Sequence, residues 1–461
     1  MPDWLPDLTG NDKPRYLAIA DAIARDIKSG RLAPLDRLPP QRQLARRLRV
    51  DFTTVARGYV EAQKRGLIES RVGRGTFVRQ AQRKVRTAAA ARRPELVDFS
   101  MNLPPEPDDP LLLARMELGL EAVGQDLVAL MRYQGFGGSD AAKDGALKWL
   151  AQRALTPAAD RLFITPGAHP ALLGIFTTLA RSRDLILSEA ITYPGARALA
   201  AQLGLELRGL PMDEAGIDPD AFAKVCAERT PKALYLNPTL QNPTTLTIPP
   251  ERRAEIVAVA RRYGVPIVED DAYGFIPVDG PAPFTALAPE LTWHVAGLAK
   301  CLGAGLRLAY VITPDARSGW PFAAALRGAV VMASPLTEAL ATRWIEDGTA
   351  DALLRFIRKE TMARQALAAE MLPAGSYRAD PLSFHLWVPL SPPWTRSSFV
   401  GHMRASRIGV VASDAFTVDG TPIEAVRVCL GGPTERSGVR SALEFMAHAL
   451  TESPAFTSSF L

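Results

Sequence analysis

The sequence has few of the residues that cross-link small secreted proteins or bind metal ions. Only three cysteines (Cys226, Cys301, Cys429) and five histidines occur in 461 residues, and their spacing fits neither a disulfide framework nor a metal motif. No run of about 18 apolar residues is present, so no membrane-spanning helix is predicted. Residues 1–7 lack the basic and apolar stretches of a signal peptide. These absences favour a cytoplasmic protein without a metal site.

The composition is that of a folded globular protein. Hydrophobic residues make up 47% and charged residues 22% of the chain. A length of 461 residues exceeds that of one ordinary domain, so two or three domains are expected.

Charge is distributed unevenly along the chain. Of 54 Lys and Arg and 49 Asp and Glu, residues 1–93 hold 21 and 9, which leaves 33 and 40 for the remainder. A basic N-terminal region before an acidic remainder indicates a polyanionic partner, although a basic face can also be merely solvated.

Residues 12–80 have the pattern of three helices followed by a hairpin. A helix is predicted over residues 14–29 and a second one after Pro40, and Thr53 or Thr54 is expected to open a third that ends near Gly66. Residues 67–78 alternate like a two-stranded hairpin with a Gly-Arg-Gly tip. This order predicts a winged helix-turn-helix, in which the third helix reads the major groove of double-stranded DNA.

The same stretch resembles the DNA-binding domain of the GntR family. The resemblance lies in Leu-Pro-Pro-Gln-Arg-Gln-Leu-Ala (38–45), Thr-Thr-Val (53–55), Gly-Leu-Ile-Glu-Ser (66–70) and Gly-Arg-Gly-Thr-Phe-Val (73–78). It implies that Arg42, Thr53, Thr54 and Arg74 contact DNA, with Arg57 and Arg71 as additions. Phe52 stands where family members often have Arg, so the recognised operator differs at that contact. The alternative is a small helical domain used for dimerisation.

Residues 81–97 are rich in Ala and Arg and have no apolar periodicity. This composition predicts a flexible or fraying helical linker. Its positive charge either adds non-specific phosphate contacts or is simply solvated.

Residues 98–461 alternate helical patterns with short apolar strands. Strands are predicted over residues 162–165, 185–187, 233–236, 266–269, 293–296 and 308–312. The alternation indicates an α/β fold with a mostly parallel sheet that binds ligands at the carboxyl ends of its strands.

Polar residues follow these strands where a cofactor would bind. Lys300 lies among Leu, Ala and Gly residues, and a desolvated lysine with a lowered pKa is the nucleophile that forms a Schiff base. Asp270 could pair with a pyridinium nitrogen. Asn242 and Tyr273 could bind a phenolic oxygen, and Arg307 a phosphate.

In this order the motifs resemble the fold-type I aminotransferases over residues 98–461. The resemblance implies pyridoxal 5′-phosphate (PLP) as cofactor, an internal aldimine on Lys300 and Asp270 under the pyridine nitrogen. It also implies a large PLP-binding domain over 98–335 and a small α+β domain over 336–461.

Further residues take roles from the same resemblance. Ala168 and His169 begin the helix whose N–H groups hold the phosphate. Tyr193 stacks on the ring, Tyr133 reaches the phosphate of the neighbouring subunit, and Arg427 binds a substrate or effector carboxylate. The alternatives are a strand-end cap for Asp270, packed aromatic side chains for the two tyrosines and a structural ion pair for Arg427.

Four residues depart from the common pattern. Gly297 and Ala299 replace serines near the lysine, Thr245 replaces a glycine and Ala304 replaces a proline. The loss of a serine hydroxyl implies looser binding of the cofactor phosphate, while the chemical groups themselves remain.

A GntR-type reader joined to such a domain is the architecture of the MocR family of regulators. The resemblance implies a domain-swapped homodimer that senses an amino compound, or PLP itself, and alters its affinity for DNA. The rival hypotheses are a working aminotransferase with an accessory DNA-binding domain and a regulator that no longer binds PLP.

Overall fold

The computed structural model describes residues 4–8, 14–29, 31–32, 36–71, 75–78 and 97–451. The chain divides into two compact units, residues 1–94 and 95–461, which we call the head and the body. Among the described residues no helix is long and apolar enough to cross a membrane.

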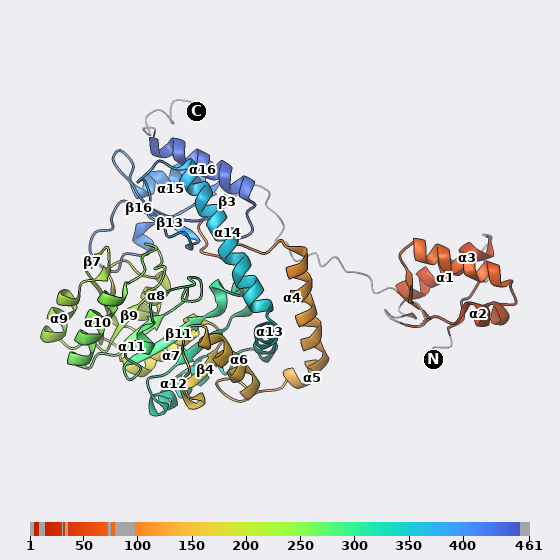
Figure 1. The fold of residues 1–461 in the computed structure, drawn as a ribbon, viewed down its shortest axis with the longest axis horizontal. Helices are drawn as coiled ribbons and strands as arrows, with labels where there is room; N and C mark the ends of the chain where they lie inside the picture. Colours follow the sequence, from red (N-terminus) through yellow and green to blue (C-terminus); the bar gives the residue numbers. More distant parts are fainter. Residues whose placement is uncertain are drawn as a thin grey trace. The chain divides into compact units, whose positions relative to one another are not determined.

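The head contains three helices and a two-stranded hairpin, as the sequence predicts (Figure 1). Its elements are α1 (Arg15–Lys28), α2 (Gln41–Leu48), α3 (Phe52–Lys64), β1 (Ile68–Arg71) and β2 (Gly75–Val78). Ile23, Leu44 and Tyr59, from the three helices in turn, are buried in one apolar cluster. Gly58 allows α3 to approach α1 closely, because a Cβ there would lie 3.0 Å from the backbone oxygen of Tyr16.

The third helix begins earlier than the sequence suggested. Neither Thr53 nor Thr54 opens it: Asp51 is the N-cap, and its carboxylate accepts the backbone N–H of Thr53 at 2.7 Å. Aspartate is a favoured N-cap because it satisfies a helix-start N–H that has no partner within the helix. Because Val50 and Asp51 had been predicted to form a turn, the helix was predicted to start one or two residues too late.

Some predictions for the N-terminal region fall outside the described residues. Arg74 and most of the predicted linker, residues 81–96, are among them. Arg71 is described only as a backbone position at the end of β1.

The body is organised around a seven-stranded sheet. The strand order is β4 (Leu162–Thr165), β12 (Ala309–Ile312), β11 (Thr292–Gly297), β10 (Ile267–Asp270), β9 (Ala233–Leu236), β5 (Leu185–Glu189) and β6 (Glu206–Leu210). Only β12 runs antiparallel to its neighbours β4 and β11. The mostly parallel sheet predicted from the sequence is therefore confirmed, and β6 is an additional edge strand.

Helices cover both faces of this sheet (Figure 1). On one face, α7 (Ala168–Leu179), α8 (Pro194–Gln202) and α12 (Ala316–Val330) bury a cluster that includes Tyr235 and Val268. On the other, α9 (Pro219–Glu228), α10 (Pro250–Tyr263) and α11 (Phe284–Leu287) pack against Leu234 and Ile267. Because successive strand residues point to opposite faces, Asp270 shares the face of Tyr235, whereas Glu269 faces α10 and α11.

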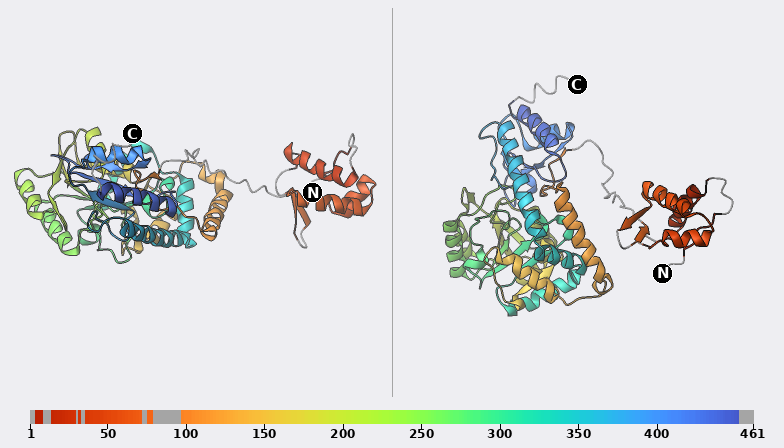
Figure 2. Two further views of the ribbon diagram at one scale, coloured as in Figure 1. Left: turned by 90° about the horizontal axis from the view of Figure 1, so that it is seen from above. Right: turned by 45° about the vertical axis from the view of Figure 1, so that its right-hand side comes forward.

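The C-terminal part of the body forms a second layer. Its antiparallel sheet has the order β13 (His385–Pro389), β16 (Ala425–Cys429) and β15 (Val411–Ala412). The helices α15 (Arg396–Ala405) and α16 (Arg436–Thr451) contribute to its apolar cluster. Figure 2 shows the long helix α14 (Thr349–Met371) joining this layer to the rest of the body.

Four short strands form two further pairs in the body. The strand β3 (Val97–Asp98) pairs in parallel with β14 (Ile408–Gly409), so the first described residues of the body belong to the C-terminal layer. The pair β7 (Met212–Asp213) and β8 (Gly216–Ile217) forms a small hairpin.

A helical layer flanks the large sheet. It contains α4 (Pro110–Val123), α5 (Leu127–Leu130), α6 (Asp140–Ala151) and α13 (Pro335–Glu346). Several large apolar side chains of this region are exposed, namely Leu111, Leu118, Leu120, Leu127, Val128 and Met131.

Candidate functional site

The carboxyl ends of five parallel strands of the large sheet (β4, β5, β9, β10 and β11) meet the C-terminal layer at one cavity of about 370 Å³. Apart from Tyr133, every residue that the sequence assigned to a cofactor or effector site in the body lines it. These residues are Ala168, His169, Tyr193, Asn242, Asp270, Tyr273, Lys300, Arg307 and Arg427. The structure thus gathers residues that lie up to 259 positions apart in the sequence.

Lys300 follows β11 in a short 3₁₀ turn, Leu298–Lys300. Burial lowers the pKa of its amine to about 8, and the positive charge of Arg427 acts in the same direction. A larger fraction of the amine is therefore neutral near pH 7 than in an exposed lysine, which makes it a better nucleophile.

Asp270 ends β10, and its carboxylate is oriented by Tyr235. The Tyr235 hydroxyl donates to Asp270 Oδ2 at 2.8 Å, while Oδ1 is buried with no hydrogen-bond partner. Burial raises the pKa of Asp270 to about 6, against the lowering effect of the Tyr235 bond. Neither carboxylate oxygen accepts a backbone N–H, so Asp270 is not a strand-end cap.

Asn237, two residues after Tyr235, joins the loop after β9 to the end of β10. Its Nδ2 donates to the Asp270 backbone oxygen at 2.7 Å, and its Oδ1 accepts the backbone N–H of Asn242 at 2.9 Å. Tyr235 and Asn237 are site residues that were not predicted from the sequence. A lone tyrosine inside the apolar strand 233–236 is the signal that could have identified Tyr235.

Arg427, on β16, lies on the wall of the cavity that the C-terminal layer forms. Its Nη1 donates to Asn242 Oδ1 at 2.9 Å and its Nη2 donates to the backbone oxygen of Ser100. Its Nε is buried without a partner. Within the described residues no carboxylate forms an ion pair with it, which disfavours the structural ion-pair alternative.

The Tyr273 hydroxyl and the Lys300 amine both contact Asn102, another residue that the sequence did not single out. Asn102 Nδ2 donates to Tyr273 Oη at 2.7 Å, and Lys300 Nζ donates to the Asn102 backbone oxygen. The two polar residues Ser100 and Asn102, which follow the apolar Phe99, were the only sequence signal.

One end of the cavity is suited to an anion. Gly167, with φ of 101°, precedes α7, and a Cβ there would lie 3.2 Å from Arg307 Nη2. A glycine therefore lets the Arg307 guanidinium lie beside the N-terminus of α7, where unpaired N–H groups favour negative charge. Burial and the charge of Arg307 lower the pKa of His169, which keeps its imidazole neutral at pH 7.

The two tyrosines differ in their placement. Tyr193 caps α8, is half-buried and lines the cavity. Tyr133 is 85% exposed and does not line the cavity of its own chain. Its exposure disfavours the packed-aromatic alternative, and its role across a subunit interface stays a prediction.

The residues that replace the usual serines and proline lie at the cavity wall. Gly297, Ala299 and Ala304 all line it. A Cβ at Gly297 would meet nothing closer than 3.7 Å, and its φ of −75° suits any residue. The absence of a hydroxyl there is thus a property of the sequence rather than a steric requirement.

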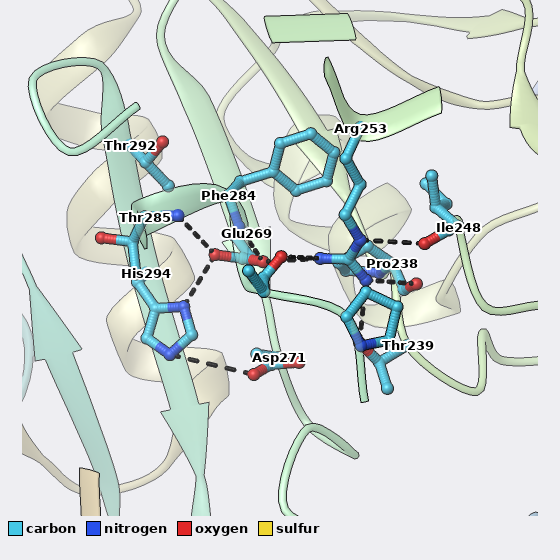
Figure 3. Close-up of polar contacts among 12 residues, drawn as sticks. Pro238, Thr239, Ile248, Arg253, Glu269, Asp271, Phe284, Thr285, Thr292 and His294 are labelled. Atoms are coloured by element: carbon cyan, nitrogen blue, oxygen red, sulfur yellow. Dashed lines mark hydrogen bonds and ion pairs between the residues drawn. The ribbon is translucent and has the colours of Figure 1, made fainter. Parts of the chain in front are cut away.

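Figure 3 shows a buried ionic network of Glu269, His294 and Arg253. Glu269 lies on the face of β10 opposite to that of Asp270. Glu269 accepts from His294 Nδ1 at 2.8 Å and lies 3.4 Å from Arg253 Nη1, and all three side chains are fully buried. Burial disfavours protonated His294, but the hydrogen bond and charge of Glu269 outweigh it and raise the pKa of His294. The network fixes the strand that presents Asp270.

Of the predicted DNA-binding residues, Arg42 lies in the first turn of α2, Thr53 and Thr54 lie in the first turn of α3, and Arg57 lies one turn further along α3. Arg42 is exposed, with its guanidinium 5.9 Å from the ring centre of Phe52, which is 44% exposed. Thr54 is half-buried, and the Thr53 hydroxyl donates to Asp51, which leaves its oxygen able to accept. The Arg57 guanidinium stacks over the Tyr16 ring at 4.5 Å.

Comparison with known proteins gives two family matches. Residues 15–78 match bacterial regulatory proteins of the gntR family, and residues 95–442 match aminotransferase class I and II. Over 454 residues the chain is 27% identical to the uncharacterized HTH-type transcriptional regulator YdeF of Bacillus subtilis (strain 168), covering 97% of each chain. It is 24% identical to YisV, another such regulator of that organism, covering 96% of this chain and 98% of YisV.

Solved structures resemble the body. The alpha-aminoadipate aminotransferase LysN of Thermus thermophilus, complexed with N-(5′-phosphopyridoxyl)-L-leucine, superposes with a TM-score of 0.69. The match covers 77% of this chain and 92% of LysN at 21% identity. At this identity the likeness establishes the fold of the body and no more.

Proposed function

Because the chain belongs to the aminotransferase class I and II family and carries a GntR-family helix-turn-helix domain, we propose that it is a transcriptional regulator that binds PLP covalently on Lys300 and senses an amino compound or PLP itself. The architecture is that of HTH-type regulators of the MocR type. The observation that carries the proposal is that Lys300, with its lowered pKa, and the unpartnered Oδ1 of Asp270 face one cavity.

The residues of the cavity fit PLP in its three chemical parts. Lys300 supplies the amine for the aldehyde, and the buried Asp270 oxygen supplies a partner for a protonated ring nitrogen. Arg307 and the N-terminus of α7 offer a site for the phosphate. When bound, PLP supplies an aldehyde that captures amines and a ring that accepts electrons.

The phenolic oxygen of the cofactor would lie between Asn242 and Tyr273. Asn242 Oδ1 already accepts from Arg427, so its amide nitrogen is the group left to donate. Tyr273 Oη accepts from Asn102, which leaves its own proton to donate. Both groups would therefore offer hydrogens to an oxygen anion.

Arg427 is the residue that we assign to an anionic effector. Its guanidinium is buried at the cavity wall and is paired with neutral acceptors rather than a carboxylate. A carboxylate or sulfonate of the effector could accept two parallel bonds from such a group. An effector with an amine and an acid would then reach both Lys300 and Arg427.

The head is proposed to bind an operator in double-stranded DNA, in the cytoplasm. Arg42, Thr53, Thr54 and Arg57 lie on α2 and the first part of α3, the elements that contact DNA in a helix-turn-helix. Arg71 and Arg74 remain proposed wing contacts on the basis of the sequence alone.

We also propose that the protein acts as a domain-swapped homodimer, in which each head works together with the body of the partner subunit. Exposed apolar side chains on α4 and α5, including Leu118 and Val128, supply a surface suited to a second copy. Tyr133 follows this surface and is 85% exposed, as a residue that serves the neighbouring subunit would be.

The second candidate function is a working aminotransferase. It is favoured by the presence of Lys300, Asp270 and Arg427 around one cavity. Turnover of amino acid and keto acid pairs at about 1–1000 per second would support the enzyme. We expect turnover to be slow or absent.

The decisive experiment combines absorbance with DNA protection. The chain with PLP should show a visible absorbance band that Lys300→Ala abolishes. It should protect DNA from upstream of its own gene, and PLP or candidate amines should change that protection. A band that survives Lys300→Ala with covalently held PLP, or protection that never responds, would contradict the proposal.

A further inference from the structure

The segment that follows the linker forms part of the cavity wall. Val97 and Asp98 pair with β14, and the Phe99 backbone oxygen accepts from the N–H of Cys429 at 2.9 Å. Ser100, Met101 and Asn102 then line the cavity. Residues 97–103, which we call the wall segment, are therefore the continuation of the chain that leaves the DNA-binding head.

The wall segment occupies hydrogen-bond donors that a ligand would need. The Ser100 backbone oxygen accepts from Arg427 Nη2, and the Asn102 backbone oxygen accepts from Lys300 Nζ. These two oxygens are two residues apart. They accept hydrogen bonds from Arg427 and Lys300, the two residues that we expect to bind the acid group and the amine of an effector.

Asn102 is the most heavily bonded residue of this segment. Its side chain is buried, Nδ2 donates to Tyr273 Oη at 2.7 Å, and Oδ1 accepts from Cys429 Sγ at 3.6 Å. These contacts fix the residue, so its backbone oxygen is held toward the Lys300 amine.

We propose that the wall segment links the ligand state of the cavity to the DNA-binding head, with Asn102 as the linking and positioning residue. The inference rests on the proposed function, because it requires that Lys300 captures an aldehyde and that the head binds DNA.

The chemistry of Lys300 supplies the link. Condensation of a neutral amine with an aldehyde forms a C=N bond and releases one water, which carries away both amine hydrogens. The Asn102 backbone oxygen then loses its donor, and a buried carbonyl without a partner is unfavourable. A carboxylate at Arg427 would compete with the Ser100 oxygen in the same way. Both events favour a shifted wall segment, and the residues that precede it lead to the head.

The test measures coupling between PLP and DNA in the full-length chain. The probe DNA is a fragment from upstream of its own gene, and its dissociation constant is measured with and without saturating PLP. In the wild-type chain we expect the two dissociation constants to differ at least about fivefold, and the fragment to change PLP affinity by the same factor.

Asn102→Ala and Asn102→Asp should bring the ratio of the dissociation constants with and without PLP to within about twofold of one. Glu106→Ala, which removes an exposed side chain from the stretch just beyond, is the matched control and should keep the wild-type ratio.

A second readout separates positioning from a merely structural role. In Asn102→Asp the new carboxylate would accept from Tyr273 and turn its proton away from the cavity. The pH midpoint of the visible absorbance band should then rise by about one unit or more, because the cofactor oxygen loses a donor and gains a nearby negative charge. Asn102→Ala should raise it less.

The outcomes are distinct. A wild-type ratio of one, or a ratio that the Asn102 variants keep, overturns the inference even if the absorbance midpoint moves. If neither Asn102 variant folds, Tyr273→Phe serves instead, because it removes the hydroxyl that Asn102 contacts and keeps Asn102 itself. A wild-type ratio of dissociation constants in Tyr273→Phe would also overturn the inference. A wild-type chain with no visible band, with no binding to the fragment, or with binding that responds to neither PLP nor candidate amines removes the proposed function itself.

Discussion

Arg427 Nη1 donates to Asn242 Oδ1 at 2.9 Å, which joins the C-terminal sheet directly to the loop after β9 in the large sheet. The same guanidinium donates to the wall segment at Ser100. Through these bonds one arginine connects the C-terminal layer, the large sheet and the segment that continues from the head. A ligand that takes over either of these two donors would therefore disturb a contact between these parts.

Arg427→Lys should preserve PLP binding and greatly weaken the response to an acidic amino compound. A lysine keeps the positive charge but cannot form two parallel bonds to a carboxylate. The measurement is DNA binding of the PLP-loaded variant across a panel of amino acids and sulfonates, with the visible band as the check on PLP. A response equal to that of the wild type would indicate that the effector lacks an anionic group or is PLP alone.

The rate of covalent PLP capture should rise with pH up to about 8 and then level off. The folded chain lowers the pKa of Lys300 to about 8, so only the neutral fraction attacks the aldehyde. Below that pH the fraction, and the rate, should fall about tenfold per unit. Absorbance after rapid mixing measures the rate. A rate that continues to rise to pH 10 would show an amine with an ordinary pKa.

Gly297→Ser should tighten PLP binding about tenfold, or about 1.4 kcal/mol, because the added hydroxyl can donate a hydrogen bond to the phosphate. The backbone conformation at Gly297 suits any residue, and a Cβ there would lie no closer than 3.7 Å to another atom. Gly297→Ala adds the same Cβ without the hydroxyl and is the control. Equal effects of the two variants in an equilibrium titration would exclude a hydrogen bond at this position.

Arg42→Ala should weaken binding to the upstream DNA fragment by about 1–3 kcal/mol and leave the visible band unchanged. Arg42 is exposed at the first turn of α2. Lys64→Ala removes the same charge at the far end of α3, roughly 16 Å along the helix axis from Thr53. Equal losses in the two variants would show that only net charge matters and that the proposed docking is wrong.

Much of the fold follows from local patterns in the sequence. Apolar runs that end in polar residues predicted six of the seven strands of the large sheet to within two residues at each end. The spacing of apolar residues and the Gly-Arg-Gly tip predicted the three helices and the hairpin of the head. Both kinds of pattern are local because they reflect which face of one helix or strand is buried.

The sequence also indicated part of the cavity lining, because Asn242, Asp270 and Lys300 stand at or directly after the ends of strands that converge there. It did not indicate Asn102 or Asn237, which line the same cavity.

The tertiary structure alone decided how those groups are paired. Asn102 contacts Tyr273 across 171 positions of sequence, and Arg427 contacts Ser100 across 327. Tyr235 and Asp270 meet because neighbouring parallel strands place them on one face. Hydrogen bonds are short and directional, so a pairing between distant segments depends on packing geometry that residue types and spacing do not contain.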